Sequence, residues 1–187
     1  MNRIGILALQ GDYAAHAAAV LRAGASSFEA RTAEDIESAP AMIIPGGEST
    51  VMGSLLIRFG LMDTLIRRIR EGMPVFGTCA GLILLASRIE GRRQPGIGLL
   101  DVGVRRNAYG TQVDSFREHI ETSIPEVRRL EAVFIRAPKI TSVGPEVEVL
   151  ASCRGDPVLV RQGLIVGAAF HPELNPDAAI HRWFLGL

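Results

Sequence analysis

The chain has 187 residues, of which 48% are hydrophobic and 21% are charged, and its formal net charge is zero. This length suffices for one α/β domain with a sizeable core, so we predict a single domain over residues 1–187. The balanced charge argues against partners such as nucleic acid or an anionic membrane, and no apolar segment is long enough to span a bilayer.

The N-terminal half alternates apolar strands with helices. Asp12, Thr32 and Ser49 are the expected helix N-caps, because their side-chain oxygens can accept hydrogen bonds from the first helical N–H groups. The elements predicted in chain order are a strand at 3–9, a helix at 13–23, a strand at 28–31, a short helix after Thr32, a strand at 41–44, helices at 49–57 and 60–71, and a strand at 73–76. This order predicts a parallel sheet with helices on both faces.

The C-terminal half has short strands separated by turns that contain glycine and proline. The elements predicted here are strands at 99–105, 132–135, 147–151, 158–161 and 164–170, and a helix at 175–185 that is capped near Asn175. Short connections favour antiparallel pairing. The predicted fold class is therefore α/β, with a mixed, mainly parallel central sheet flanked by helices in three layers and an antiparallel C-terminal portion.

Cys79 stands between Gly77 and Gly81, with an apolar strand before it and an apolar helix after it. This is the pattern of a nucleophile elbow, in which glycine permits a tight turn. The positive end of the following helix favours the reactive thiolate, so Cys79 is our candidate nucleophile for a covalent intermediate. A packing role, which we assign to Cys153, is the alternative for an isolated cysteine.

His171 is the candidate base for this thiol, and it follows the apolar run at 164–170. Glu173 lies two residues on, and residues two apart in an extended segment point to the same side. The carboxylate would then orient the imidazole, as in a catalytic triad. A His-Pro pair after a strand is typical of a simple turn, so it is the combination with Cys79 that favours catalysis.

Two consecutive glycines, Gly46 and Gly47, follow a predicted strand and precede a helix. A βα turn is the ordinary interpretation of such a loop. Beside a nucleophile elbow, glycine also frees backbone N–H groups to face a developing oxyanion. The N–H groups of Gly47 and Ala80 are our candidate oxyanion donors, with Gln10 supporting that corner of the sheet.

Two loops that follow predicted strands contain an arginine, Arg106 in one and Arg136 in the other. Either guanidinium could bind a substrate carboxylate, or both could be ordinary surface arginines. The sequence has no zinc-ligand spacing, no carboxylate cluster for a hard cation and no nucleotide-binding glycine motif, so we expect no metal and no cofactor. Two cysteines and a short N-terminal apolar run favour a cytoplasmic location.

Several segments together resemble, nearly end to end, the glutaminase subunit family of pyridoxal 5'-phosphate synthase. The elbow and the His171–Glu173 pair are shared with the wider class I (triad) glutamine amidotransferases. The segments at 106–110 and 134–138 narrow the resemblance to this subunit. The matching segments are 9–11, 45–50, 77–81, 106–110, 114–116, 134–138 and 171–174.

The resemblance implies a flavodoxin-like, class I amidotransferase fold. It also implies that L-glutamine is hydrolysed to L-glutamate and ammonia through a thioester on Cys79, with His171 as the base and Glu173 as its orienting group. The ammonia would pass to a (β/α)8-barrel synthase subunit in a hetero-oligomer that makes pyridoxal 5'-phosphate (vitamin B6). The residues implied to line the glutamine site are Gly46, Gly47, Glu48, Arg106, Ile135 and Arg136.

The chain departs from this family at Ala15, where a glutamate commonly precedes His16, and at Thr111, where an arginine is common. Both changes bear on contacts with the partner or with the loop near glutamine. Three alternatives remain open: an amidotransferase that serves another acceptor, a cysteine peptidase or DJ-1-like protein, and a binding module with a decayed site. The intact set of Cys79, His171 and Glu173 argues against the last.

Overall fold

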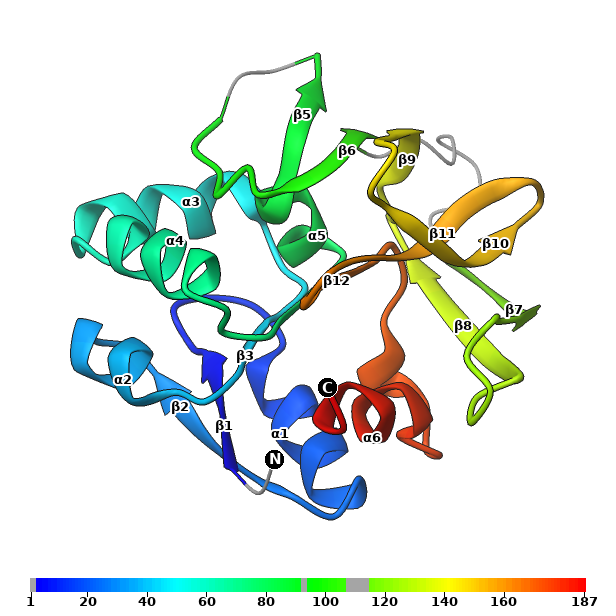
Figure 1. Cartoon of the computed structure of the whole chain (residues 1–187), viewed down its shortest axis with the longest axis horizontal. Helices are drawn as coiled ribbons and strands as arrows, with labels where there is room; N and C mark the ends of the chain where they lie inside the picture. Colours follow the sequence, from blue (N-terminus) through cyan, green and yellow to red (C-terminus); the bar gives the residue numbers. More distant parts are fainter. Residues whose placement is uncertain (1–2, 92–93, 107–114) are drawn as a thin grey trace.

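A computed structural model describes residues 3–91, 94–106 and 115–187 (Figure 1). Its centre is a seven-stranded sheet with the strand order β10 (Glu148–Cys153), β11 (Asp156–Gln162), β12 (Ile165–Ala168), β4 (Val75–Thr78), β3 (Met42–Ile44), β1 (Arg3–Leu7) and β2 (Ser26–Ala30). From β12 to β2 all neighbours pair in parallel, whereas β11 and β10 are added antiparallel. The predicted mixed, mainly parallel sheet is confirmed.

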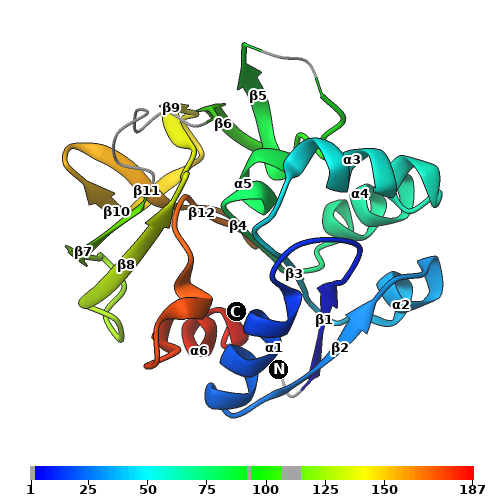
Figure 2. The same ribbon diagram turned by 180° about the vertical axis from the view of Figure 1, so that it is seen from behind.

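Helices cover both faces of this sheet (Figures 1 and 2). The helices on one face are α3 (Ser49–Arg58), α4 (Met62–Arg70) and α5 (Ala80–Leu85). The opposite face carries α1 (Tyr13–Arg22) and α6 (Ala179–Leu185), and α2 (Ala33–Ser38) packs beside α4. Among the described residues no single helix has the length and apolarity needed to cross a membrane; only α3 and α4 taken together, bent by 98°, meet that test of length and composition.

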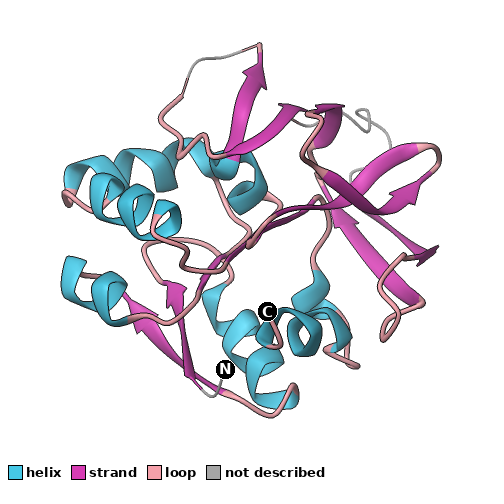
Figure 3. Cartoon of the chain, in the orientation of Figure 1, coloured by secondary structure: helices cyan, strands magenta, loops and turns pink. Residues whose placement is uncertain are grey.

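Two small sheets complete the fold (Figure 3). One contains β5 (Ala86–Glu90), β6 (Leu100–Arg105) and β9 (Lys139–Val143), and the other is the antiparallel pair β7 (Ser115–Glu121) and β8 (Arg129–Ile135). Strands β5, β7 and β9 were not predicted from the sequence. Most residues of β5 and β7 are at least partly exposed, so these strands lack the apolar run that marks a buried strand.

The capping predictions have mixed outcomes. Thr32 caps α2 in a complete capping box, as expected. Ser49 is wrong as a cap, because Glu48 takes that position and its carboxylate accepts from the N–H groups of the first turn of α3. Asp12 occupies the N-cap position of α1 but makes no capping hydrogen bond.

The last helix begins at Ala179, later than the predicted 175. Two features delay it. Residues Pro172–Leu174 form a short 3-10 turn, η1, and Asn175 ends that turn instead of capping a helix. Ala178 then adopts a left-handed conformation with φ 51°, which interrupts a continuous helix.

One buried apolar cluster runs from Ile4 to Leu185. It joins the small hairpin to the main sheet, because Phe134 on β8 packs edge-on against Phe170 with ring centroids 5.8 Å apart. Phe170 immediately precedes His171. The packing of the core therefore fixes the end of β8 beside the end of β12.

Candidate active site

Cys79 lies at the turn between β4 and α5, where its backbone has φ 47° and ψ −99°. A positive φ is uncommon for residues other than glycine and persists where the surroundings impose it. The Cys79 N–H donates to the carbonyl of Ala168 on β12 over 2.8 Å. A Cβ at Gly81 would collide with the carbonyl of Ile44, so glycine is needed for the elbow to approach β3. The strand–turn–helix geometry predicted around Cys79 is present.

His171 follows β12 and is hydrogen-bonded to Cys79. Its Nδ1 lies 2.7 Å from Oε1 of Glu173, and its backbone N–H donates to the carbonyl of Val133 on β8 over 2.8 Å. The expectation that His171 and Glu173 share one side of an extended segment is wrong, because Glu173 lies in the 3-10 turn η1. The turn nevertheless brings the two side chains together.

The contacts of His171 set its charge. Burial alone would lower its pKa, but the hydrogen bonds to Cys79 and Glu173 raise the pKa of His171 to about 10. The protonated ring is therefore favoured at neutral pH. An imidazolium beside a sulfur atom stabilises the thiolate, which is the nucleophilic form of cysteine.

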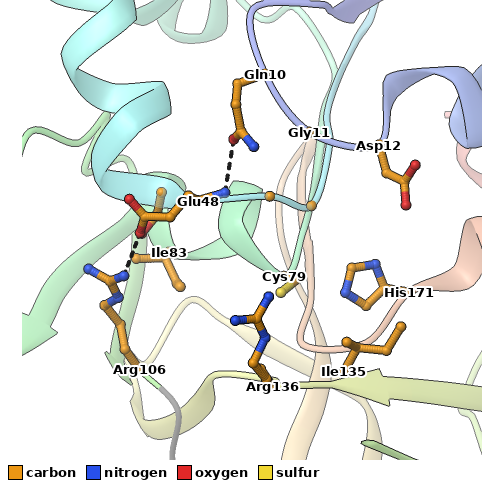
Figure 4. Close-up of a pocket in the computed structure, with 13 residues that line it drawn as sticks. Gln10, Gly11, Asp12, Glu48, Cys79, Ile83, Arg106, Ile135, Arg136 and His171 are labelled. Carbon is orange, nitrogen blue, oxygen red and sulfur yellow. Dashed lines mark hydrogen bonds and ion pairs between the residues drawn. The ribbon is translucent and has the colours of Figure 1, made fainter. Parts of the chain in front are cut away.

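Cys79 and His171 open onto a pocket of about 400 Å³ (Figure 4). The predicted site residues that line it are Gln10, Gly46, Gly47, Glu48, Cys79, Arg106, Ile135, Arg136 and His171. Two others lie outside the lining. Ala80 is the first residue of α5, where backbone N–H groups have no intrahelical acceptor, and Glu173 contacts His171 from the protein interior.

The glycine loop lies against both reactive side chains. A Cβ at Gly46 would be 2.5 Å from Cε1 of His171, so this position tolerates only glycine. Gly47 has φ 155°, and its neighbour Glu48 donates its N–H to Oε1 of Gln10 over 2.9 Å. The Gly46 carbonyl accepts from the N–H of Asp12 over 3.1 Å, which fixes the orientation of the Gly46–Gly47 peptide.

The arginine predicted at position 106 lines the pocket but is already paired. Its guanidinium donates to Oε1 of Glu48 over 2.5 Å, to Oγ1 of Thr50 over 2.8 Å and to Oε1 of Gln94 over 2.9 Å. Burial raises the pKa of Glu48, but the N–H groups of α3 and the Arg106 charge outweigh it and lower that pKa overall. Arg106 therefore holds Glu48 in place.

Arg136 has a different setting. It follows β8 with φ 43°, is exposed, and makes no hydrogen bond or ion pair within the part of the chain that the structure describes. Its guanidinium extends toward Cys79 (Figure 4). Residues with imposed positive φ are concentrated at functional sites, and an unpaired cation in a pocket can receive an anionic group.

The pocket also contains residues that the sequence analysis missed, namely Gly11, Asp12, Ser49 and Ile83. Asp12 was expected only as a helix cap, whereas Figure 4 shows it at the pocket near His171. A glycine in the loop between the first strand and the first helix was the available signal for Gly11, whose Cβ would collide with the Gly46 carbonyl. The motif residues at 107–110 and 114, and Thr111, lie outside the described residues.

Comparison with known proteins identifies relatives that match nearly the whole length of this chain. A protein of Desulforudis audaxviator named pyridoxal 5'-phosphate synthase subunit PdxT is 49% identical over 185 residues, covering 99% of this chain and 98% of that protein. The protein of the same name from Mycolicibacterium vanbaalenii is 49% identical over 188 residues, covering 98% of this chain and 96% of its own length.

Solved structures agree with the fold. A structure described as a glutamine amidotransferase superposes with a TM-score of 0.93 at 46% identity, over 97% of this chain and 96% of that one. A PurLQS structure from Thermotoga maritima has a TM-score of 0.75 at 14% identity and shows the shared fold alone. A family model described as the SNO glutamine amidotransferase family matches residues 6–186. This chain therefore belongs to the SNO glutamine amidotransferase family.

Proposed function

We propose that this chain is a glutaminase, which hydrolyses L-glutamine to L-glutamate and ammonia and supplies the ammonia for synthesis of pyridoxal 5'-phosphate. The observation that carries the proposal is the thiol of Cys79, held at a strained elbow and hydrogen-bonded to His171, which is bonded to Glu173. The family and the names of the relatives support the substrate and the product. Residues 1–187 would act as one amidotransferase domain.

The reaction would proceed in two halves. The sulfur of Cys79 attacks the side-chain amide carbon of glutamine, and the carbon–nitrogen bond then breaks to leave a glutamyl thioester. His171 gives the departing ammonia the proton that came from the thiol. In the second half His171 accepts a proton from water, whose oxygen displaces the sulfur and releases glutamate. Glu173 keeps the ring of His171 oriented throughout.

The backbone N–H groups of Gly47 and Ala80 are the proposed donors to the oxyanion, and each such donor contributes about 10²–10³-fold to kcat. Gln10 supports the loop through its bond to the N–H of Glu48. Because N–H and C=O of a trans peptide point in opposite directions, the bond between Asp12 and the Gly46 carbonyl also sets the direction of the Gly47 N–H. If partner binding turned this peptide over, the direction of the Gly47 N–H would reverse with it.

For substrate binding, Arg136 is the proposed anchor for the α-carboxylate, because its guanidinium is unpaired within the described residues. The carboxylate of Glu48, oriented by Arg106, has the charge to receive the α-ammonium group. Gly46 and Ile135 would form the walls of the glutamine site. This assignment separates the two arginines that the sequence pattern left equivalent.

The proposed partner is a synthase subunit with a (β/α)8-barrel fold, in a hetero-oligomer. The relatives are named as subunits of pyridoxal 5'-phosphate synthase, and the barrel follows from the family resemblance. Chemistry favours a direct connection, since free ammonia is largely protonated at neutral pH and an enclosed transfer keeps it nucleophilic.

Glutamate release from glutamine, measured for the chain alone and with the synthase subunit, tests the proposal. We expect hydrolysis that increases by about two orders of magnitude with the partner, as for completion of an oxyanion hole. Pyridoxal 5'-phosphate should form from glutamine only when both proteins are present. Equal turnover with and without the partner would remove the peptide-turn hypothesis. Absence of glutamate release in both cases, with cleavage of peptides instead, would favour the peptidase alternative.

A further inference from the structure

A buried polar cluster adjoins the triad. His16 on α1, Thr78 at the end of β4 and His181 on α6 are each 0% exposed, and Glu173 is 2% exposed. None of these residues lines the pocket. Polar side chains are rarely buried unless hydrogen bonds compensate the loss of water, so the contacts within this cluster indicate what it does.

His16 is the centre of the cluster. Its Nδ1 lies 3.0 Å from Nε2 of His181, and its Nε2 lies 3.0 Å from Oγ1 of Thr78 and 3.4 Å from Oε2 of Glu173. The carboxylate of Glu173 thus stands between two imidazoles, because its Oε1 faces Nδ1 of His171. Within the described residues Oε2 has no hydrogen bond of regular geometry, so His16 is the polar group that faces it.

The positions of the protons follow from this geometry. An ionised carboxylate only accepts hydrogen bonds, so we place the proton of His16 on Nε2, which is hydrogen-bonded to Oγ1 of Thr78 and also lies 3.4 Å from Oε2 of Glu173. A neutral ring carries one such proton, and Nδ1 of His16 therefore accepts from Nε2–H of His181. That tautomer leaves Nδ1 of His181 unprotonated, and it is the nitrogen of this pair without a partner among the described residues. A buried lone pair without a partner is more tolerable than a buried N–H without one.

Both rings are neutral. Burial first, and then His181 and His171, hold the pKa of His16 well below its usual value. Burial and the charge of Arg22 lower the pKa of His181 to about 4. The cluster is also unlike a metal site, since no group of three or more His, Cys, Asp or Glu side chains in the described segments is arranged to hold an ion.

We propose that His16 is a positioning residue of the triad: its Nε2–H, which also faces Oγ1 of Thr78, lies against one oxygen of Glu173 so that the other oxygen stays on Nδ1 of His171. His181 fixes the ring of His16. A neutral donor suits this task, because a charged His16 would compete with His171 for the carboxylate. The titratable and charged groups facing the pair are Glu173, His171 and Arg22, whose guanidinium donates to the Glu173 carbonyl over 3.1 Å. The kinetic consequence rests on the proposed glutaminase function.

Two substitutions separate the contacts of His16. The amide of glutamine can place an N–H near the position of Nε2, whereas the amide of asparagine reaches only the position of Nδ1. In the complex with the synthase subunit, His16→Asn is expected to lower kcat about tenfold with KM changed less than about twofold, while His16→Gln retains most of kcat. Unchanged kcat in His16→Asn, or equal losses in both variants, would overturn the proposal.

A double-mutant cycle distinguishes positioning from general packing. If His16 acts through the carboxylate, His16→Asn should lower kcat no further in a Glu173→Gln background, whereas additive losses would contradict this role. Val20→Ala is the matched control, because Val20 is fully buried one turn further along the same face of α1. It should lower the melting temperature without lowering kcat, and a loss of kcat equal to that of His16→Asn would count against the proposal.

Alkylation of Cys79 by iodoacetamide gives a readout that needs no glutamine. A displaced His171 stabilises the thiolate less, so His16→Asn should slow alkylation at neutral pH several-fold, with Cys79→Ala reporting the background from Cys153. An unchanged rate would overturn the positioning role. If the wild-type chain failed to hydrolyse glutamine while His16→Asn still slowed alkylation, the glutaminase function would fail and the positioning role would stand.

Discussion

The two cysteines of this chain are similarly buried, Cys79 being 8% exposed and Cys153 3% exposed, yet their surroundings differ. Cys153 ends the edge strand β10, where burial and then the nearby Glu118 raise the pKa of its thiol. Cys79 is hydrogen-bonded to His171, lines a pocket and is held at a positive φ. Neighbours and backbone geometry, rather than exposure, therefore distinguish a candidate nucleophile from a packing residue.

Replacing each cysteine in turn tests this comparison most directly. Cys79→Ala should reduce glutamate release to background, while Cys153→Ala should keep kcat within about twofold of wild type. Alanine removes little packing at the elbow, so circular dichroism should show both variants folded. Hydrolysis by folded Cys79→Ala would contradict the proposed mechanism.

Removing the neighbours of Cys79 should have the next largest effect. His171→Asn eliminates the group that moves the proton and should lower kcat by about 10⁴-fold or more. Glu173→Gln only weakens the orientation of the ring, so its loss of kcat should be smaller by about one to two orders of magnitude. Steady-state glutamate release measures both. The reverse ranking would show that Glu173 does more than orient His171.

The elbow itself can be strained by one methyl group. Gly81→Ala places a Cβ against the carbonyl of Ile44, and we expect it to lower the free energy of unfolding by about 2–3 kcal/mol. Gly186→Ala, where a Cβ would lie 3.3 Å from the nearest atom and φ is −88°, is the control and should change that free energy by less than about 0.5 kcal/mol. Urea unfolding measures both, and equal effects would remove the packing argument.

A further effect is expected on the pH dependence of stability. The pKa of His171 is raised from 6.5 to about 10 in the folded state, so its contribution is fully present below pH 6.5 and is lost as pH rises toward 10. The difference in unfolding free energy between wild type and His171→Asn should shrink over that range. The pKa of His181 is instead lowered from 6.5 to about 4 in the folded state. Its neutral form therefore contributes stability that should be lost as pH falls from 6.5 toward 4.

The sequence was most informative where one residue type is required by local geometry. Alternating apolar runs and helices predicted the parallel core, and the glycines around Cys79 predicted the elbow. Strands β5 and β7 were not predictable in the same way. In β5 burial has no clear period, and β7 alternates between more and less exposed residues but buries only Ile120.

The finer assignments in the site depended on contacts between distant segments. Arg106 and Arg136 have equivalent positions in the sequence pattern, and only the tertiary structure pairs Arg106 with Glu48. His16 and His181 lie 165 residues apart on helices that the pattern treats as ordinary, so their hydrogen bond had no local signal. Long-range pairing of polar side chains is the part that a single sequence does not reveal.

The hydrogen bond from the His171 N–H to the Val133 carbonyl ties the reacting group to β8, the strand that Arg136 directly follows. On the proposed mode of binding, the interval between the carboxylate anchor and the attacked carbon is then a fixed length. The site would therefore select substrates by the length of the amino acid side chain. Asparagine, shorter by one methylene, would engage either the anchor or the sulfur, and the backbone bond thereby becomes a source of substrate selectivity.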